Sequence, residues 1–371
     1  MKHFAGQWLG DFTGASSGMA LLDLDQGEQW LEGSVYAFSN DREQASYFAP
    51  VTIIPQQDTI RFAASALAIH PLYPRFLQDG EFPEAEQNIE IEVKASLDST
   101  FLKGTWASSN GASGEVTLYP SQAASPSEYK PQGEATSWES FQAKVAELCT
   151  QPYRYIFRGQ AEPWRLRTSF HRTHRKDLWR YWEKDIKRIR HASVGVTSHI
   201  FDSANPDQNG AFLHLLQHHG YPTPLLDWTY SPYIAAYFAF ASAPVDRDYD
   251  APVRIFMFDA EKWQDDWPPV LNMTLCQPHF SLLEPLAIDN DRALPQQSMA
   301  AVTNIDDIEA YIRFRERQKG TTYLRVFDLP HSLRTDVLRQ LGLMGISPGS
   351  LFPGVEGLCR EYRDRHFGYL L

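Results

Sequence analysis

Residues 215–240 read LLQHHGYPTPLLDWTYSPYIAAYFAF, and this stretch decides how the second half of the chain is interpreted. Its first part places four polar side chains around a glycine turn: Gln217, His218, His219 and Thr223, with Gly220 between them. Its second part has Ser231 before Pro232, which is typical of a helix N-cap followed by proline at the first helical position. The stretch therefore predicts a polar turn, a short apolar run and a helix at about 231–242.

A second informative stretch lies upstream, where YRYIFRGQ (153–160) predicts an apolar and aromatic strand that ends on Arg158 and Gly159. From this position the planar guanidinium of Arg158 can donate two parallel hydrogen bonds to a phosphate or a carboxylate. Gly159 would let a ligand approach the backbone. A structural ion pair or a surface charge is the alternative for Arg158.

The first 121 residues predict an all-β domain, a barrel or a sandwich. Segments that alternate apolar and polar residues are separated by turn residues, at 19–25, 30–38, 51–55, 59–67, 89–97, 101–108 and 114–120. The opening and closing segments resemble each other, so we expect their strands to lie side by side in a closed sheet. Trp8, Trp30 and Trp106 are interpreted as core or strand-pairing aromatics. The domain carries no titratable constellation and is interpreted as a recognition or regulatory module.

Residues 122–136 have the Pro, Ser, Gly and charged composition of a linker, which separates the β domain (1–121) from a second domain (137–371). Ser137 begins an amphipathic helix. Further helices are expected at about 175–200, 208–219, 231–242, 305–318 and 332–342, and strands at 253–258 and 323–327. This mixture predicts an α+β domain.

Composition excludes an integral membrane protein, because 43% of the residues are hydrophobic and 22% charged, without an apolar run of about 18 residues. The start, MKHFAGQWLGDF, lacks the pattern of an export signal, so a cytoplasmic location is expected. The three cysteines are far apart and odd in number, which favours neither a disulfide framework nor a zinc site: Cys149, Cys276 and Cys359.

The net charge of −12 is concentrated in the first 130 residues, where 7 basic and 17 acidic residues give −10. This part should repel nucleic acid. Residues 165–190 instead hold ten Lys or Arg and three Asp or Glu, a local excess of +7. A solvated helix face and a surface for phosphates are the two interpretations of this basic stretch.

The adjacent histidines do not predict a metal site. Neighbouring residues in a strand or loop point to different sides, and no third ligand has suitable spacing near His218 and His219. A neutral histidine that shapes a pocket is favoured. His219 is also a candidate general base, because an unperturbed imidazole titrates near pH ~6.5.

Four blocks in order resemble the signatures of the FRG-domain family: FRGQ at 157–160, QHHGYPTPLLDW at 217–228, SPYIAAYFA at 231–239 and LFPGVEGL at 351–358. The resemblance covers about residues 140–371. It implies a shared fold and pocket, with these ligand contacts: Arg158, Gly159, Gln160, Gln217, His218, Thr223, Asp227 and Trp228. The chain departs from the family at Pro224, where an arginine is usual, and residues 292–302 match only loosely the family's glutamine-containing strand.

The chain also has a more distant similarity to the ADP-ribosyltransferase plan. This similarity implies that Arg158 holds an NAD phosphate and that Thr229 or Ser231 lines the nicotinamide pocket. Glu356 or Gln297 would take the place of the glutamate that binds a ribose hydroxyl and stabilises developing positive charge. An ordinary charge in the first turn of a helix is the alternative for Glu356.

Two classes of function stay open after these arguments. The first is an NAD-consuming ADP-ribosyltransferase or glycohydrolase that acts as a toxin or defence effector, with Arg158, His219 and Glu356 as catalytic residues and NAD as substrate. The second is a non-catalytic protein that senses a nucleotide or a nucleic acid. Both imply a nucleotide as ligand, no metal and no membrane, with a protein or nucleic acid as a further target.

Overall fold

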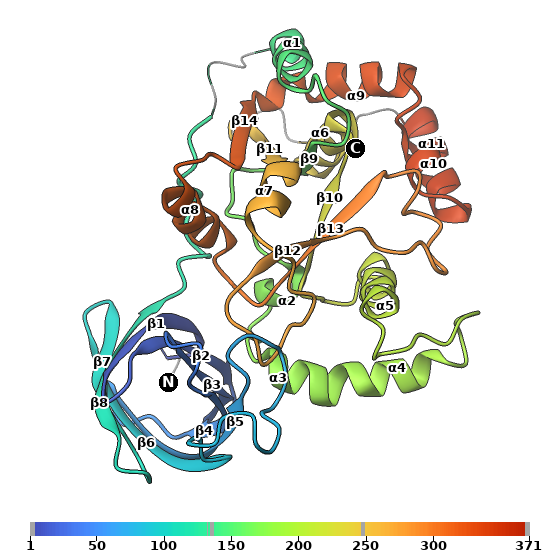
Figure 1. Ribbon diagram of the computed structural model, residues 1–371. Helices are drawn as coiled ribbons and strands as arrows, with labels where there is room; N and C mark the ends of the chain where they lie inside the picture. Colours follow the sequence, from blue (N-terminus) through green and yellow to red (C-terminus); the bar gives the residue numbers. More distant parts are fainter. Residues whose placement is uncertain (1–3, 132, 134–136, 246–248, 368–371) are drawn as a thin grey trace.

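The computed structural model describes residues 4–131, 133, 137–245 and 249–367, so part of the expected linker at 122–136 lies outside the described residues. The chain begins with a closed antiparallel barrel (Figure 1). Its strands are β1 (Gly6–Gly14), β2 (Gly18–Gln26), β3 (Leu31–Ser39), β4 (Ser46–Ile53), β5 (Thr59–Ile69), β6 (Asn88–Asp98), β7 (Phe101–Ser108) and β8 (Ser113–Pro120). β1 pairs with β8 from Trp8↔Pro120 to Gly14↔Gly114, which confirms that the similar opening and closing segments lie side by side.

The rest of the described chain is built on one six-stranded antiparallel sheet in the order β12-β13-β10-β9-β11-β14. These strands are β9 (Tyr155–Gln160), β10 (Leu225–Thr229), β11 (Val253–Asp259), β12 (Phe280–Leu283), β13 (Ser298–Thr303) and β14 (Leu324–Leu329). Sheet and helices together form the expected mixed α/β region. β10 was not expected, because its five residues alternate too briefly to be told from a buried loop.

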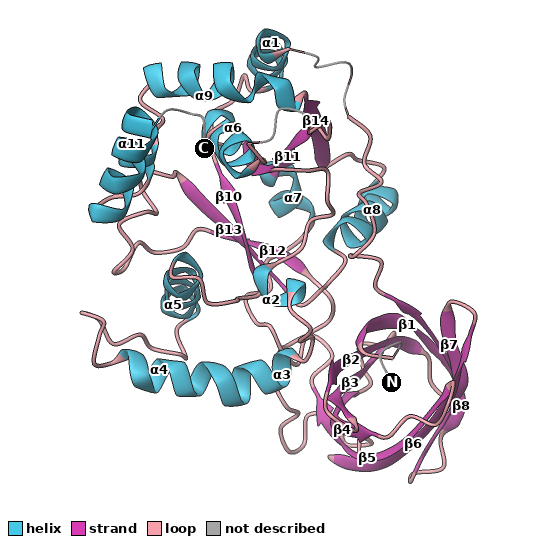
Figure 2. Ribbon diagram, turned by 180° about the vertical axis from the view of Figure 1, so that it is seen from behind, coloured by secondary structure: helices cyan, strands magenta, loops and turns pink. Residues whose placement is uncertain are grey.

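The helices surround this sheet (Figure 2). They are α1 (Trp138–Leu148), α2 (Ser169–Arg172), α3 (Leu178–Arg180), the π-helix η1 (Tyr181–Ile186), α4 (Lys187–Ser193), α5 (Pro206–His218), α6 (Pro232–Ser242), α7 (Ala260–Asp266), α8 (Ile308–Lys319), the 3₁₀-helix η2 (His331–Leu333), α9 (Arg334–Leu343), α10 (Pro348–Leu351) and α11 (Val355–Phe367). Within the described residues, none of these helices has the length and apolar character needed to cross a membrane.

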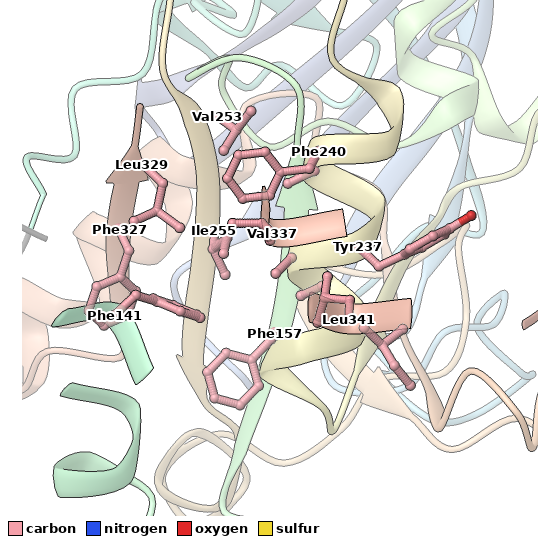
Figure 3. Close-up of a cluster of buried hydrophobic side chains, with 14 of the residues drawn as sticks. Phe141, Phe157, Tyr237, Phe240, Val253, Ile255, Phe327, Leu329, Val337 and Leu341 are labelled. Carbon is pink, nitrogen blue, oxygen red and sulfur yellow. The ribbon is translucent and has the colours of Figure 1, made fainter. Parts of the chain in front are cut away.

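One face of the sheet is covered by α6, with α1 and α9 beside it (Figure 3). Phe240 of α6 and Phe157 of β9 are fully buried in this layer, together with Ile255 of β11. The opposite face is closed by α7 and α8 through Trp263 and Ile312. Because both faces of the central strands are covered, β11 reads as a continuous buried run rather than as an alternating one.

Gly159 sets how closely α6 approaches β9. A Cβ atom on this residue would lie 1.9 Å from the carbonyl oxygen of Ala235 and 2.8 Å from the amide nitrogen of Ala239. Only glycine permits a helix backbone at this distance. The structure therefore places α6, and not a ligand, on the side of Gly159 where a side chain would stand.

The basic stretch 165–190 makes the contact with the barrel. Four of its arginines form ion pairs with carboxylates elsewhere in the chain: Arg165 with Asp307 and Glu128, Arg167 with Asp306, Arg175 with Asp25, and Arg180 with Glu32. Trp179 packs on Phe48 of β4, with ring centroids 4.6 Å apart. Much of the local excess of positive charge is thus neutralised inside the protein, by partners that the local sequence does not reveal.

The segment after the barrel lies along α8 as far as it is described. Ser127 donates to Glu309 at 2.7 Å and the hydroxyl of Tyr129 donates to Glu316 at 2.9 Å. Residues 126 and 164 also form an isolated β-bridge. This part of the expected linker is therefore held against the second region by specific contacts.

Substituting Gly159 with alanine should destabilise the protein strongly. The added methyl group meets helix backbone, which cannot move without shifting α6, so we expect a loss at the upper end of the ~1–3 kcal/mol that overpacking costs. Gly342→Ala in α9 is the matched control, since a Cβ on Gly342 would meet no atom within 4 Å and helical alanine gains ~0.5–1 kcal/mol over glycine. Urea denaturation of both variants tests this. Equal stability of the two variants would contradict the close approach of α6.

The barrel contact should also depend on pH through Asp177, which caps α3 and accepts a hydrogen bond from Ser34 of β3 at 2.9 Å. Burial raises the pKa of Asp177 to about 6. Between about pH 4 and pH 6 the folded protein therefore holds a proton that the unfolded chain releases, so the stability contributed by this group is lost as the pH rises through 6.

Asp177→Asn keeps both acceptor roles and removes this titration. The variant should gain stability relative to the parent between pH 4 and pH 7, by up to ~3 kcal/mol, as measured by denaturation at several pH values. The exposed control Asp79→Asn should show no such trend. A difference between parent and Asp177→Asn that stays constant with pH would exclude a raised pKa at this contact.

Candidate functional site

The candidate site lies at the centre of the sheet, where β9 and β10 separate. Among the described residues these strands pair only through Thr229↔Phe157, although β10 stays paired with β13 and β9 with β11 along their lengths. Arg158 bridges the separation, since its Nη1 donates a hydrogen bond of 2.6 Å to the backbone carbonyl of Asp227. The guanidinium is thereby fixed between the two strands.

Arg158 carries a poorly compensated positive charge. Its Nε atom is buried and has no hydrogen-bond partner among the described residues. Desolvation, followed by the positive charge of Arg172, lowers the pKa of Arg158 to about 10, and Asp227 acts in the opposite direction. Among the described residues, Arg172 is itself held by one long hydrogen bond of 3.4 Å to Gln160. Two arginines with spare donors thus lie close together.

Two histidines one helical turn apart lie near the side chain of Asp227. His214 and His218 of α5 have ring centroids 4.2 Å apart, as expected for positions i and i+4. His214 is fully buried and His218 is partly buried. Between them lies the side chain of Asn290, whose Oδ1 is 2.8 Å from Nδ1 of His218 and whose Nδ2 is 3.0 Å from Nδ1 of His214.

The carboxamide of Asn290 gives the two imidazoles opposite tautomers. A carboxamide accepts through oxygen and donates through nitrogen, so one ring must present an N–H to it and the other a bare nitrogen. This holds for either orientation of the amide. Consequently one imidazole has a protonated Nε2, a donor, and the other a bare Nε2, an acceptor. The pair can therefore offer a ligand one donor and one acceptor while both rings are neutral.

Asp227 joins the histidines to Arg158. Its Oδ1 lies 3.9 Å from Nε2 of His214, too far for a hydrogen bond, and neither atom has a partner among the described residues. Burial lowers the pKa of His214 to about 4, despite the opposing effect of Asp227, so this ring is neutral near pH 7. The Asp227 side chain is 40% exposed, which gives the cluster a route to solvent.

The structure thus brings together three of the residues expected from the sequence: Arg158, His218 and Asp227. It places His219 elsewhere, exposed at the end of α5. Trp228 is buried on the other face of β10, where it packs on Phe258. Neighbouring residues of a strand point to opposite faces, so Asp227 and Trp228 cannot line the same pocket.

The residues expected to line a nicotinamide pocket are occupied by structural contacts. Thr229 donates to the carbonyl of Gln296 at 2.7 Å, and Ser231 caps α6 by accepting from the amide of Ile234 at 3.3 Å. Gln297 is exposed in the turn before β13, with a positive φ of 47°. Gln296 is buried and donates to the carbonyl of Leu351. These contacts leave the side chains of Thr229, Ser231 and Gln296 engaged with the protein itself.

Glu356 lies in the first turn of α11 and is paired with Arg292 and with Arg360. It touches the cluster only indirectly, because Arg292 also donates to the backbone carbonyl of His218 at 2.8 Å. Glu356 is therefore placed as an ion-paired helix charge. Within the cluster itself, the carboxylate is that of Asp227.

The other expected contacts support the walls of the site. Gln160 donates a hydrogen bond to the carbonyl of Trp164 at 2.8 Å and accepts one from Arg172. Thr223 is fully buried and bonded to Gln217, which also accepts from Ser169 at 3.3 Å. These side chains hold the segments on either side of the cluster together.

Sequence reasoning missed His214, Asn290 and Arg172. His214 and His218 have the i, i+4 spacing of one helix face, and this signal was available within the expected helix 208–219. Asn290 lies 72 residues beyond His218 in an irregular segment, so no local pattern could indicate it. Arg172 was counted only within the basic stretch.

His214, His218 and Asp227 each offer one atom within 4.8 Å of the others, which is a loose grouping for a metal ion. Ligands of one zinc ion lie at most ~4 Å apart, and each ligating imidazole needs an acceptor for its other N–H. Asn290 can serve only one ring in this way. Asn290→Asp would let both rings donate to a carboxylate and so expose both Nε2 atoms.

We therefore expect Asn290→Asp to bind Co²⁺ or Zn²⁺ at least ~10-fold more tightly than the parent. The absorption of bound Co²⁺ and the shift in melting temperature with Zn²⁺ measure this. His218→Gln in the same background should remove the gain. Equally tight binding by the unsubstituted protein would show that Asn290 does not set the tautomers.

Comparisons with known proteins give two β-barrel structures and one family model. Among solved structures, the redesigned β-barrel mFAP1 bound to DFHBI matches with 13% identity over 32% of this chain and 95% of that chain, with a TM-score of 0.24. The redesigned barrel b11L5F_LGL matches with 15% identity over 32% and 91%, with a TM-score of 0.23. No curated protein matches. The family model "FRG domain" matches residues 153–248, which include Arg158, His214, His218 and Asp227. The chain therefore contains an FRG domain.

Proposed function

We propose that the FRG domain binds a phosphate-bearing ligand, with a nucleotide as the favoured class, between Arg158 and Arg172. The observation that carries this proposal is the state of Arg158. Its charge is desolvated, its Nε has no partner among the described residues, and its hydrogen bond goes to a neutral carbonyl. A desolvated charge that is only partly compensated is costly, and an anionic ligand would compensate it further.

The pair of arginines suits a phosphate better than a single cation would. Each guanidinium can donate two parallel hydrogen bonds, and within the described part of the chain Arg172 makes one long bond. Near Asp227, His214 and His218 can offer one donor and one acceptor when both rings are neutral. Such groups bind the hydroxyl and amide groups of a ribose or a base rather than a second anion, and this favours a nucleotide over a simple inorganic ion.

A second candidate, cleavage of NAD, is favoured by Asp227. NAD cleavage develops positive charge on the ribose, which a carboxylate held nearby stabilises. Asp227 has an Oδ1 atom without a partner among the described residues, next to the proposed phosphate site. It would take the role that the sequence assigned to Glu356.

Replacing either arginine of the pair by methionine should weaken ATP and NAD binding by ~10- to 100-fold, because each variant loses charge-assisted hydrogen bonds worth ~1.5–3 kcal/mol. Isothermal titration calorimetry of Arg158→Met and Arg172→Met measures the loss. Arg188→Met, on the exposed side of α4, removes a charge from the same basic stretch and should bind as the parent does.

The melting temperature without ligand separates binding from folding. Arg158→Met removes a desolvated charge that Asp227 compensates only in part, so this variant should be at least as stable as the parent. Unchanged affinity in both arginine variants would refute the proposed site. A large loss of stability in Arg158→Met would instead make Arg158 a structural residue.

The second candidate predicts that the protein releases nicotinamide from NAD and that Asp227→Asn lowers this rate while NAD still binds. Chromatography of the reaction products, with candidate proteins and nucleic acids as acceptors, measures release. No release under any of these conditions, together with intact binding, would reject NAD cleavage and leave nucleotide binding in place.

A further inference from the structure

The barrel encloses a cavity of about 670 Å³. Cavities of ~300–1,000 Å³ are the size that takes small organic ligands. Eight strands form a barrel just wide enough either to be filled by its own side chains or to hold one small molecule. The side chains on the inner face decide between these outcomes.

Here the inner face leaves space, because alanines occupy inward positions on several strands. The lining residues of this kind are Ala20, Ala37, Ala49, Ala66 and Ala95. Larger apolar side chains line the remaining wall, among them Val35, Ile60, Phe62, Ile91 and Trp106. Cores are ordinarily packed without voids larger than a water molecule. A continuous space of this volume is therefore better explained as a binding site than as imperfect packing.

The cavity is closed at one end and open at the other. At the closed end, Phe4 and Trp8 pack with large residues of β2, β3 and β4, namely Leu24, Leu31 and Ile53. The open end is formed by the four connections β1–β2, β3–β4, β5–β6 and β7–β8, which contribute Ser16, Gln44, Glu84 and Asn110 to the lining. An up-and-down barrel places these alternate connections at one end, so together they make a single polar mouth.

The charge of the mouth restricts the ligand. Of the described residues that line the cavity, three are carboxylates, Glu43, Glu81 and Glu84, and none is Lys, Arg or His. Arg75 pairs with Glu81 at 2.5 Å, which leaves the other two acids at the rim. An anionic group would be repelled there and would have no cation to pair with inside.

We propose that the barrel binds a small, mainly apolar molecule whose polar end is uncharged or cationic. The apolar part lies among the inward alanines and aromatic residues, and the polar end lies at the acidic mouth. This site in the barrel is separate from the cluster around Arg158, and its lining is apolar where that cluster is polar. It is nevertheless connected to the FRG region, since Phe76 of the β5–β6 connection contacts Trp179 with ring centroids 5.8 Å apart.

Two fluorescent probes that share the same aromatic rings test the cavity site and its preference against anions. N-phenyl-1-naphthylamine is uncharged, and its 8-sulfonate is an anion of the same shape. The full-length protein should bind the uncharged probe with a saturable rise in fluorescence at one site per chain, and the sulfonate at least ~10-fold more weakly. No saturable binding of the uncharged probe would overturn the cavity site. Equal affinity for the two probes would overturn the assignment of charge.

Substituting Ala66 with leucine tests whether the uncharged probe binds inside the barrel. Ala66 and Ala63 lie on the same strand, the first buried in the lining and the second exposed on the outer face. Ala66→Leu fills part of the cavity and should weaken the uncharged probe at least ~10-fold without lowering the melting temperature, whereas Ala63→Leu should bind as the parent does. Ala37→Leu repeats the test from another wall, should Ala66→Leu fail to fold. Undiminished binding in a folded cavity-filling variant would contradict the proposal.

Discussion

The separation of β9 from β10 is the constraint on which the candidate site in the FRG domain (residues 153–248) depends. Along most of their length these two central strands are not paired, and the side chain of Arg158 takes the place of backbone hydrogen bonds by donating to the carbonyl of Asp227. Gly159, the next residue, faces the other way and allows α6 to lie directly on β9. One dipeptide thus fixes a helix on one face of the sheet and a cation between the two central strands.

The cluster around Arg158 follows from that arrangement. The backbone carbonyl of Asp227 accepts the hydrogen bond from Arg158. From one face of α5, His214 and His218 lie towards the side chain of Asp227. Asn290 sets the protonation of the two rings relative to each other. The result is a group of incompletely bonded polar atoms that reaches solvent through Asp227, and such a group is a candidate for a binding or catalytic site. The barrel adds a site of the opposite character, apolar inside and acidic at its mouth.

The sequence was sufficient where the signal is local. Alternating strands, turn residues and the similarity of the first and last segments predicted a β-domain with paired ends, and the strand end at Arg158 with the block around Asp227 predicted two parts of one cluster. Contacts between residues far apart in the chain could not be predicted from the sequence. The basic stretch 165–190 was interpreted as a solvated helix face or as a surface for phosphates, but two of its arginines pair with Asp25 and Glu32, which lie about 150 residues earlier in the chain. His219 was named as a candidate general base because an imidazole titrates near neutral pH, whereas helix periodicity places His214 and His218 on one face. The hollow barrel could not be predicted either, since an inward alanine reveals a cavity only when its neighbours across the barrel are known.

The most direct test of the account is a crystal structure of the protein with a bound non-hydrolysable nucleotide. The account predicts phosphate oxygens within hydrogen-bonding distance of Nε of Arg158 and of the guanidinium of Arg172, with the rest of the nucleotide reaching towards His214 and His218. A nucleotide bound instead on the exposed basic face of α4, with the Arg158 cluster unchanged, would contradict it.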